Sequence, residues 1–246
     1  TRLRSKMNIV AVIPARYAST RFPGKALAML QGKPLIQHVF ERVKASELFD
    51  MVVVATDHDQ IVETVMGFGG NIVMTPSDLP SGTDRVADAL QFLPQADLIV
   101  NVQGDEPLVD TSALARLIDA FQSDRVQMAS LMTLITDPAM LNNPNIVKLV
   151  VDSDDDALYF SRSPIPFNRD GQPGVKYLRH IGIYAYRREV LWRFVRLPQA
   201  NLEQIEKLEQ LRALENGIPI RMVYTDYQGI GVDTPEDLAL MEKLMQ

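Results

Sequence analysis

Three cationic side chains fall within ten residues of the chain, in the segment Pro14–Lys25 that follows the first apolar run. They are Arg16, Arg21 and Lys25, and they are interleaved with serine, threonine and Gly24. Arginine donates forked hydrogen bonds and lysine offers a point charge, a combination typical of polyphosphate sites. A solvated basic loop is the alternative. Because ligands bind at the carboxyl ends of strands in an open parallel sheet, the position favours phosphate binding.

Two carboxylates later in the chain have the chemistry of a divalent cation site. Asp105 follows an apolar run, in the sequence VNVQGDEP, and Asp233 precedes a predicted helix, in GVDTPED. Mg²⁺ prefers one or two carboxylates together with phosphate oxygens. The alternatives are a turn at Asp105 and a helix N-cap at Asp233. Thr234 serves as a cap at least as well, which leaves Asp233 available as a second metal ligand.

The segment Pro80–Arg85 (PSGTDR) is predicted to be a loop that leads into a helix. Backbone N–H groups at the helix start, with the Ser81 and Thr83 hydroxyls, offer contacts for a base or a ribose. A capping turn explains the same residues. The basic loop is not a Walker loop, because Ala26 stands where Ser or Thr should bind magnesium, and no GxGxxG follows the first strand.

Other motifs in the sequence give weaker evidence of a functional site. The run Asp152–Asp156 resembles a calcium loop, but Ala157 and Ser163 replace its required Gly and Glu, so we expect an acidic turn. His38 and His58 are expected to be structural. The sequence contains no HExxH or GxSxG motif.

Composition excludes several classes of site. The 246 residues include no cysteine, which excludes disulfides and thiolate chemistry and suits a reducing compartment. A net charge of −6 and a pI near 5.1 give no global bias toward nucleic acid. No apolar run approaches the roughly 18 residues of a membrane span. We expect a cytoplasmic protein that starts at Met7, with residues 1–6 an added remnant or an alternative start.

Continuous apolar runs alternate with amphipathic segments in the first half. Such runs are typical of strands covered on both faces, in a mostly parallel sheet with crossover helices. Asp57 is expected to cap the second helix, which ends at the glycines between 67 and 70. The expected strands are 8–14, 51–55, 72–75 and 97–102, and the other expected helices are 34–45 and 84–93.

Beyond about residue 123 strand-like segments follow one another with few helices, which predicts antiparallel additions or a strand excursion away from the parallel core. They are 127–135, 145–151, 157–160 and 181–186, with a last strand at 218–223. A helix over 202–214 has apolar residues three apart, a wide arc that predicts burial on two sides, partly by another subunit. A final helix over 235–246 is capped by Thr234. We expect one domain over residues 7–246.

Eight ordered segments along essentially the whole chain resemble the CMP-Kdo synthetases, the 3-deoxy-manno-octulosonate cytidylyltransferase family. They are 13–25, 54–57, 81–85, 101–107, 157–162, 179–186, 208–212 and 232–237. The resemblance implies an α/β, Rossmann-like nucleotidyltransferase fold, with a mostly parallel central sheet and a smaller antiparallel, dimerisation excursion in the second half. It implies a homodimeric enzyme that transfers CMP from CTP to the anomeric hydroxyl of 3-deoxy-D-manno-octulosonate (Kdo), releasing pyrophosphate, with Mg²⁺, for lipopolysaccharide biosynthesis.

The resemblance also implies residue roles. Arg162 offers a fork to the carboxylate of the acidic sugar. Asp105 and Asp233 bind Mg²⁺, and with Arg16 and Lys25 they form the catalytic set. The residues implied in CTP binding are Ala15, Arg16, Arg21, Lys25, Ser81, Gly82, Thr83, Arg85 and Gln103. Those implied in sugar binding are Arg162, His180, Tyr184, Glu209 and Gln210.

The sequence departs from the family pattern in two places. Ala26 stands where relatives commonly have proline, and the connection 166–176 is shorter than in some relatives. The alternatives left open are a cytidylyltransferase for 8-amino-Kdo or sialic acid, and a non-catalytic CTP-binding sensor. The sequence does not distinguish a lipopolysaccharide from a capsule pathway.

Overall fold

The computed structural model describes residues 7–18 and 21–245, which form two compact units. Unit 1 comprises the chain up to Thr111 together with the segment from Gly229 onward, and unit 2 comprises Ser112–Gln228. The expected remnant at residues 1–6 lies outside the described residues. The expectation of one domain stays a prediction. None of the helices in the described ranges has the length and apolar character needed to cross a membrane.

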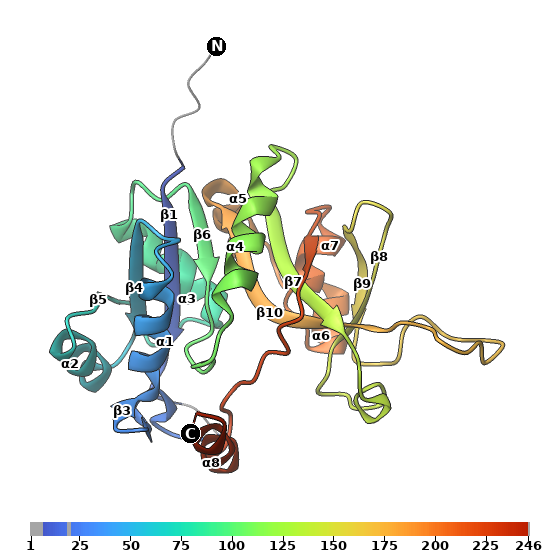
Figure 1. The fold of residues 1–246 in the computed structure, drawn as a ribbon. Helices are drawn as coiled ribbons and strands as arrows, with labels where there is room; N and C mark the ends of the chain where they lie inside the picture. Colours follow the sequence, from blue (N-terminus) through green and yellow to red (C-terminus); the bar gives the residue numbers. More distant parts are fainter. Residues whose placement is uncertain (1–6, 19–20, 246) are drawn as a thin grey trace. The chain divides into compact units, whose positions relative to one another are not determined.

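Unit 1 contains the parallel sheet that the continuous apolar runs predict. Its strands run in the order β6–β1–β4–β5, with every neighbouring pair parallel. Helices α1 and α3 both pack against β1 and β4, on opposite faces of the sheet (Figure 1). The strands are β1 (Ile9–Ala15), β4 (Met51–Thr56), β5 (Asn71–Met74) and β6 (Leu98–Asn101), and the helices are α1 (Leu35–Ala45), α2 (Asp59–Gly67) and α3 (Gly82–Ala89).

The register of the sheet brings the predicted functional loops to one edge. Ala15, the last residue of β1, lies opposite Thr56 at the end of β4, and Val12 of β1 lies opposite Asn101 at the end of β6. Because the strands are parallel, the loops that follow β1 and β6 leave the sheet at the same edge. These loops carry the basic residues and Asp105.

Two details of unit 1 differ from expectation. Asp57 does not cap α2: the N-cap is His58, whose Nδ1 accepts from the Gln60 N–H at 3.3 Å. Asp57 instead pairs with Arg85, at 2.8 Å. The chain between β1 and α1, where no strand was expected, also contains short elements, namely the 3₁₀ turn η1 (Lys25–Leu27) and the antiparallel pair β2 (Met29–Leu30) and β3 (Lys33–Pro34).

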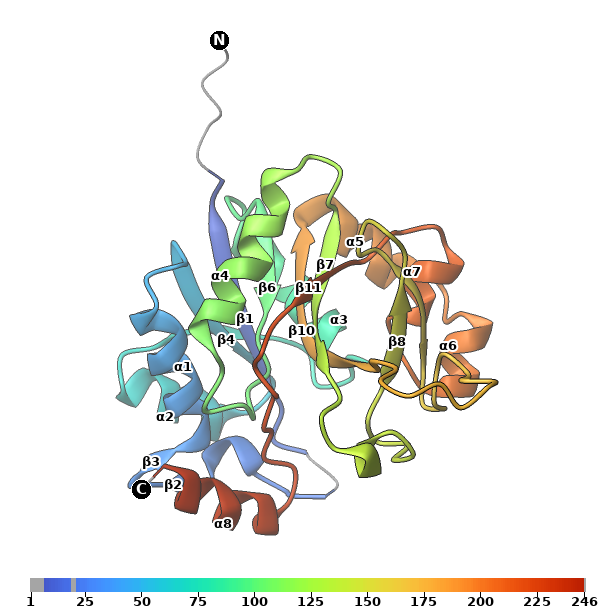
Figure 2. The same ribbon diagram turned by 45° about the vertical axis from the view of Figure 1, so that its right-hand side comes forward.

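The last helix, α8 (Pro235–Leu244), returns the end of the chain to unit 1. Thr234 caps it as predicted, and its hydroxyl accepts from the Asp237 N–H at 3.2 Å. Helix α8 lies beside β2 and β3 (Figure 2), where Met241 joins a buried apolar cluster with residues from the start of unit 1. That cluster contains Leu30, Leu35, Val232 and Met241. Apolar burial therefore fixes the segment that carries Asp233.

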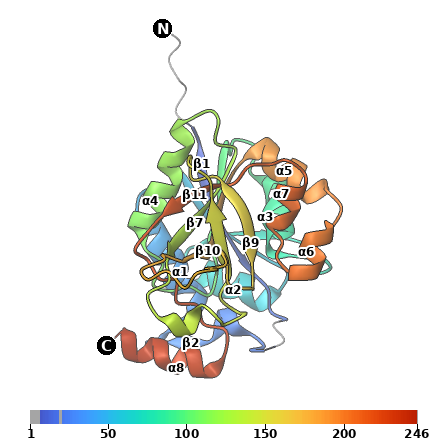
Figure 3. The same cartoon turned by 90° about the vertical axis from the view of Figure 1, so that its right-hand side faces the viewer.

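Unit 2 contains the predicted change to antiparallel pairing. Strand β10 is antiparallel to both β7 and β8, β8 and β9 form an antiparallel pair, and β11 is parallel to β7. Figure 3 shows α6 and α7 beside β9. The strands are β7 (Met128–Leu134), β8 (Lys148–Val151), β9 (Ala157–Ser161), β10 (Leu178–Arg187) and β11 (Arg221–Tyr224), and the helices are α4 (Thr111–Asp119), α5 (Arg188–Arg196), α6 (Asn201–Glu206) and α7 (Leu211–Glu215).

The single helix expected over 202–214 is wrong, because the chain forms the two short helices α6 and α7. Lys207 ends α6 with a left-handed φ of 54°, and the turn that follows reverses the chain. Ile205, expected to be buried, has 70% of its surface exposed. Spacing by three described both helices but could not reveal the turn between them. The sequence interpretation also missed α4 and α5.

A buried ion pair joins the two short helices. Arg212 of α7 donates to both carboxylate oxygens of Glu203 in α6, at 2.9 and 2.5 Å, and both side chains are 7% exposed. Burial alone would raise the pKa of Glu203, but the bonds from Arg212 and from the Ala200 N–H hold this pKa below its usual value. Arg212 also lies over the Phe194 ring, 5.0 Å from its centroid.

We predict that Arg212→Met lowers the free energy of unfolding by about 3 kcal/mol, because it leaves the Glu203 carboxylate buried without its partner. The matched control is Arg221→Met, which removes the more exposed pair with Asp156 and should cost less than about 1 kcal/mol. Urea denaturation followed by circular dichroism measures both. Equal losses in the two variants would contradict the special role of the buried pair.

Candidate active site

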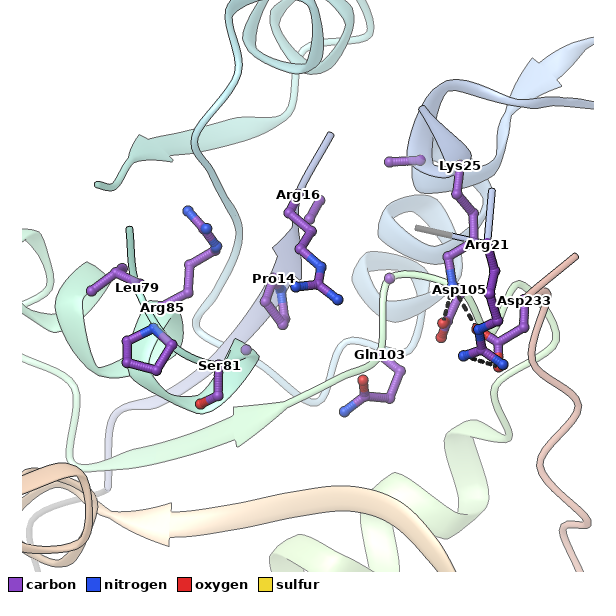
Figure 4. A pocket seen from close by; sticks show the side chains of 15 residues that line it. Pro14, Arg16, Arg21, Lys25, Leu79, Ser81, Arg85, Gln103, Asp105 and Asp233 are labelled. Atoms are coloured by element: carbon purple, nitrogen blue, oxygen red, sulfur yellow. Dashed lines mark hydrogen bonds and ion pairs between the residues drawn. The ribbon is translucent and has the colours of Figure 1, made fainter. Parts of the chain in front are cut away.

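A polar cavity of about 460 Å³ lies in unit 1, among the residues that follow β1 and β6 and those that begin α3 (Figure 4). Its volume is within the usual range for small-molecule sites. It is lined by Pro14, Ala15, Arg16, Arg21, Lys25, Ala26, Leu79, Pro80, Ser81, Gly82, Arg85, Gln103, Gly104, Asp105 and Asp233.

The cavity brings together almost all of the residues implied in CTP and metal binding. Thr83 is the exception, since it is buried within α3 and does not line the cavity. The lining residues that the sequence interpretation missed are apolar or small and carry no chemical signal of their own. A glycine is favoured at position 104 for a steric reason, because a Cβ there would lie 3.0 Å from the Pro14 carbonyl oxygen.

The basic loop is anchored by an aromatic contact that sequence reasoning did not find. The Tyr17 ring stacks on the His58 ring, with centroids 3.9 Å apart and an angle of 12°. The Tyr17 carbonyl accepts from the Gly24 N–H at 3.0 Å, and Gly24 has a left-handed φ of 68° that directs the chain into η1. Tyr17 thereby fixes both ends of the loop, from Arg16 to Lys25.

At one end of the cavity, the start of α3 contributes Ser81 and Gly82. Ser81 caps the helix by accepting from the Asp84 N–H at 3.1 Å, so the capping explanation of this segment is confirmed. The same residues line the cavity, where the helix start directs backbone N–H groups and a positive dipole. Ser81 therefore both caps the helix and lines the cavity.

Arg85 lies beside Ser81 and Gly82, and hydrogen bonds hold its side chain in place. Its guanidinium donates to Asp57 at 2.8 Å, to the Pro76 carbonyl at 3.2 Å and to the Thr75 hydroxyl. The side chains of Arg85 and Asp57 are only 4% and 11% exposed. Because its charge is already paired, Arg85 gives this end of the cavity fixed donors and shape rather than net positive charge.

The opposite end of the cavity holds two carboxylates around one ammonium group (Figure 4). Lys25 Nζ lies 2.6 Å from Asp105 Oδ2 and 3.0 Å from Asp233 Oδ1. Arg21 pairs with the other oxygen of Asp233, at 3.1 Å. Burial alone would lower the pKa of Lys25, but the two carboxylates outweigh it and raise this pKa above its usual value. Two anionic and two cationic groups thus balance at this end.

The donor set fits a magnesium ion that is shared with a phosphate ligand. Two carboxylate oxygens converge on one point, and carboxylates are the protein ligands that Mg²⁺ prefers. Among the described residues no group of three or more acidic, histidine or cysteine side chains forms a complete metal cage. Phosphate oxygens and water would have to supply the other ligands, which is the usual mode for Mg²⁺.

The residues implied in sugar binding all lie in unit 2, and His180 is at the centre of a polar and aromatic group. Its ring makes edge contacts with Phe160 and Tyr184, at centroid distances of 5.1 and 5.3 Å. His180 Nε2 lies 2.8 Å from the Ser130 hydroxyl, which also contacts the carbonyls of Ile181 and Ile183 at a bulge in β10. Carbonyls only accept, so the His180 Nε2–H donates to Ser130 and leaves Nδ1 as an acceptor.

Arg162 occupies a different setting from the one expected for a carboxylate fork. Its guanidinium donates to the carbonyls of Glu206, Pro144 and Lys207, at 2.7, 2.8 and 3.1 Å. It therefore closes the end of α6, where unpaired carbonyls need donors. Three of its five N–H groups are used in this way, and two remain for a ligand.

The other three residues implied in sugar binding divide between helix and strand. Tyr184 lies in β10, and burial, with a smaller contribution from Glu209, raises the pKa of its hydroxyl well above the usual value. Gln210 is buried at the start of α7, and Glu209 lies just before it, 4.0 Å from Arg212. Their roles toward a sugar stay predictions.

Comparison with known proteins gives consistent matches over the whole chain. A family model described as Cytidylyltransferase matches residues 10–222. The chain is 49% identical over 252 residues to a 3-deoxy-manno-octulosonate cytidylyltransferase of Thermodesulfovibrio yellowstonii, covering 97% of this chain and 98% of that protein. It is 48% identical over 240 residues to an 8-amino-3,8-dideoxy-manno-octulosonate cytidylyltransferase of Shewanella piezotolerans, covering 96% and 98%.

A solved structure is also similar along its full length. It is a CMP:2-keto-3-deoxy-manno-octonic acid synthetase complexed with CTP, with a TM-score of 0.93 and 44% identity, covering 97% of this chain and 98% of that one.

We predict that His180 stays neutral from about pH 8 down to about pH 5, because burial lowers its pKa to about 3. The unfolded chain binds this proton near pH 6.5, so His180 should also reduce stability as the pH falls below that value. Ring carbon shifts in NMR spectra, assigned with His180→Gln, test this directly. A titration midpoint above about pH 5 would show that the ring is solvated.

Proposed function

The chain belongs to the cytidylyltransferase family, and on this premise we propose that it transfers CMP from CTP to the anomeric hydroxyl of Kdo. The products are CMP-Kdo and pyrophosphate. The resemblance of the eight sequence segments and the expected nucleotidyltransferase fold are both confirmed. The observation that carries the function is one cavity lined by four cationic side chains and two carboxylates, in a chain 49% identical to a 3-deoxy-manno-octulosonate cytidylyltransferase.

The arrangement of the cavity suggests how CTP is oriented. Arg16 and Gln103 lie between the α3 end, with Ser81 and Arg85, and the charged end (Figure 4). The α3 end offers neutral and paired donors, which suit a base and a ribose. The charged end offers cations, which suit phosphates. We therefore place the cytidine at the α3 end and the triphosphate among the cations.

In the reaction, the sugar hydroxyl attacks the α-phosphorus in line and the bond to pyrophosphate breaks. Such a transfer requires positioning and charge neutralisation more than covalent help from the protein. Arg16, Arg21 and Lys25 hold the phosphates and neutralise the charge that leaves with pyrophosphate. When bound, Mg²⁺ adds Lewis-acid neutralisation at the phosphates, with Asp105 and Asp233 as its protein ligands.

Sugar recognition is assigned to the unit 2 residues. Kdo presents hydroxyls and one carboxylate, which need neutral donors and acceptors together with an anion site. His180 Nδ1 and the Tyr184 hydroxyl supply neutral groups that stay uncharged near pH 7. The two remaining N–H groups of Arg162 provide the forked contact for the carboxylate. Glu209 and Gln210 complete the set with an acceptor and an amide.

The wider setting is also proposed. The absence of cysteine suits a cytoplasmic enzyme. A homodimer and a place in lipopolysaccharide biosynthesis follow from the family pattern of the eight segments. A second candidate substrate is 8-amino-Kdo, because the chain is 48% identical to a relative named for that sugar. A non-catalytic CTP sensor would not need both carboxylates beside the cations.

The direct test is pyrophosphate release from CTP with Mg²⁺, with Kdo, 8-amino-Kdo and sialic acid supplied in separate reactions. Release with Kdo that requires CTP and stops on addition of a chelator is the expected result. Release only with 8-amino-Kdo would keep the chemistry and change the substrate. No release with any sugar, from folded protein that binds CTP, would favour the sensor.

We predict that Asp105→Asn lowers turnover roughly 100-fold or more, because an amide cannot neutralise or hold the cation at the phosphates. The matched control is Asp59→Asn, an exposed residue in the first turn of α2 that should keep normal turnover. Circular dichroism should show that both variants are folded. Near-normal turnover of Asp105→Asn would remove this residue from the metal role.

A further inference from the structure

The position of Lys25 is unusual for a residue assigned to phosphate binding. Its ammonium group does not extend freely into the cavity, because it is in contact with the two carboxylates that are assigned to the metal. Its side chain is 16% exposed, against 67% for Arg21. A lysine nitrogen and a divalent cation cannot occupy the same point between two carboxylates. In this structure the Lys25 ammonium group therefore occupies the point between the carboxylates that a metal ion would need.

Contacts other than those with Lys25 also hold the two acidic segments together. The Asp105 carbonyl accepts from the Val232 N–H at 2.9 Å, which ties the two acidic segments together. Asp233 precedes the cap of α8, and its own N–H donates to Asp237 at 3.0 Å. Val232 is fully buried in the apolar cluster under α8. Removal of the ammonium should therefore leave both carboxylates near each other and ready for another cation.

Charge balance indicates when Lys25 would leave. Lys25 and Arg21 neutralise Asp105 and Asp233, so this end of the cavity has no net charge to attract Mg²⁺. A triphosphate brings several negative charges, and a lysine on a four-carbon stem can move to them. Once the ammonium group binds the phosphates, it no longer neutralises the two carboxylates. A divalent cation can then bridge them to the nucleotide.

We propose that Lys25 is an internal counter-ion that occupies the metal position until CTP draws it away, so that metal and nucleotide binding are coupled through this one side chain. The proposal rests on the assignment of CTP and Mg²⁺ to this cavity. Coupling of this kind is reciprocal: if CTP tightens metal binding, the metal tightens CTP binding by the same factor. Typical couplings are about 5- to 150-fold.

The test measures binding of Mn²⁺ alone, as a probe of the metal position, by the electron paramagnetic resonance signal of free Mn²⁺. After correction for the Mn²⁺ that CTP binds without protein, wild-type protein should bind Mn²⁺ weakly without nucleotide and roughly tenfold or more tightly with CTP, in the absence of sugar. Lys25→Met should bind Mn²⁺ roughly tenfold more tightly than wild type without nucleotide, and gain less from CTP. Lys25→Gln provides a second neutral variant if the first does not fold.

Two control variants separate displacement from general charge effects. Arg21→Met removes a neighbouring cation but leaves Lys25 in place, so its Mn²⁺ affinity should rise much less than that of Lys25→Met. Lys33→Met removes a lysine paired with Glu41 on the surface, and should match wild type. If Lys25→Met binds Mn²⁺ no more tightly than wild type, or no more tightly than Arg21→Met, the counter-ion role is wrong.

Failure of the metal assignment would give a different result. Asp105→Asn should abolish the gain in Mn²⁺ affinity that CTP gives to wild type. If Asp105→Asn keeps that gain, the metal lies elsewhere, and both the metal assignment and the displacement that depends on it are overturned. If Asp105→Asn loses the gain while Lys25→Met stays at the wild-type affinity, the metal site stands and only the counter-ion role is refuted.

Discussion

Two carboxylates that lie more than a hundred positions apart in the chain are held against one ammonium group, and much of unit 1 serves this arrangement. Asp105 and Asp233 carry like charges, and the Lys25 ammonium group between them offsets their repulsion. The parallel register places the loops after β1 and β6 at one sheet edge, which brings Lys25 to Asp105. The apolar cluster under α8 then adds Asp233. The positions of these charged side chains therefore depend on apolar residues that are buried elsewhere in unit 1.

The sequence was informative where local pattern and chemistry agree. Continuous apolar runs predicted the strands of unit 1, and loop chemistry predicted the charged residues of the cavity apart from Arg85. The family resemblance supplied Arg85 together with Ala15, Gly82 and Gln103. Thr234 was expected to cap α8, and the capping bond confirms this. The antiparallel character of unit 2 also followed from its strand-rich second half. In each case the residue type and its spacing were sufficient, because the interaction is local or set by strand order.

The errors come from contacts between residues far apart in the sequence. Asp57 is a good capping residue, but Arg85 from α3 engages it, and the adjacent His58 caps α2 instead. Spacing by three suggested one helix where Lys207 adopts a left-handed turn and a buried ion pair joins two short helices. The stacking of Tyr17 on His58 has no signal in a single sequence. Asp57 and Tyr17 have partners far along the chain, and the break between α6 and α7 depends on one left-handed residue, so no propensity scale contains these features.

The two units differ in electrostatics, in a way that suits the two kinds of ligand proposed for them. The unit 1 cavity has ionised groups that are at least partly exposed and can exchange partners, which suits a polyphosphate and a metal that enter and leave. The group around His180 in unit 2 is neutral, because burial disfavours the charged forms of both His180 and Tyr184. Neutral donors and acceptors suit the hydroxyls of a sugar. The charged residues of unit 1 and the neutral polar residues of unit 2 thus suit different ligands.

The most direct test of the role of Lys25 is a crystal structure of the protein with CTP and Mg²⁺. The positions of Lys25, Asp105 and Asp233 in that structure decide the outcome. The account predicts that Lys25 Nζ has left both carboxylates for a phosphate oxygen, and that Mg²⁺ bridges at least one of these carboxylates to the triphosphate. A nucleotide complex in which Lys25 still lies between Asp105 and Asp233, with the metal bound elsewhere, would contradict it.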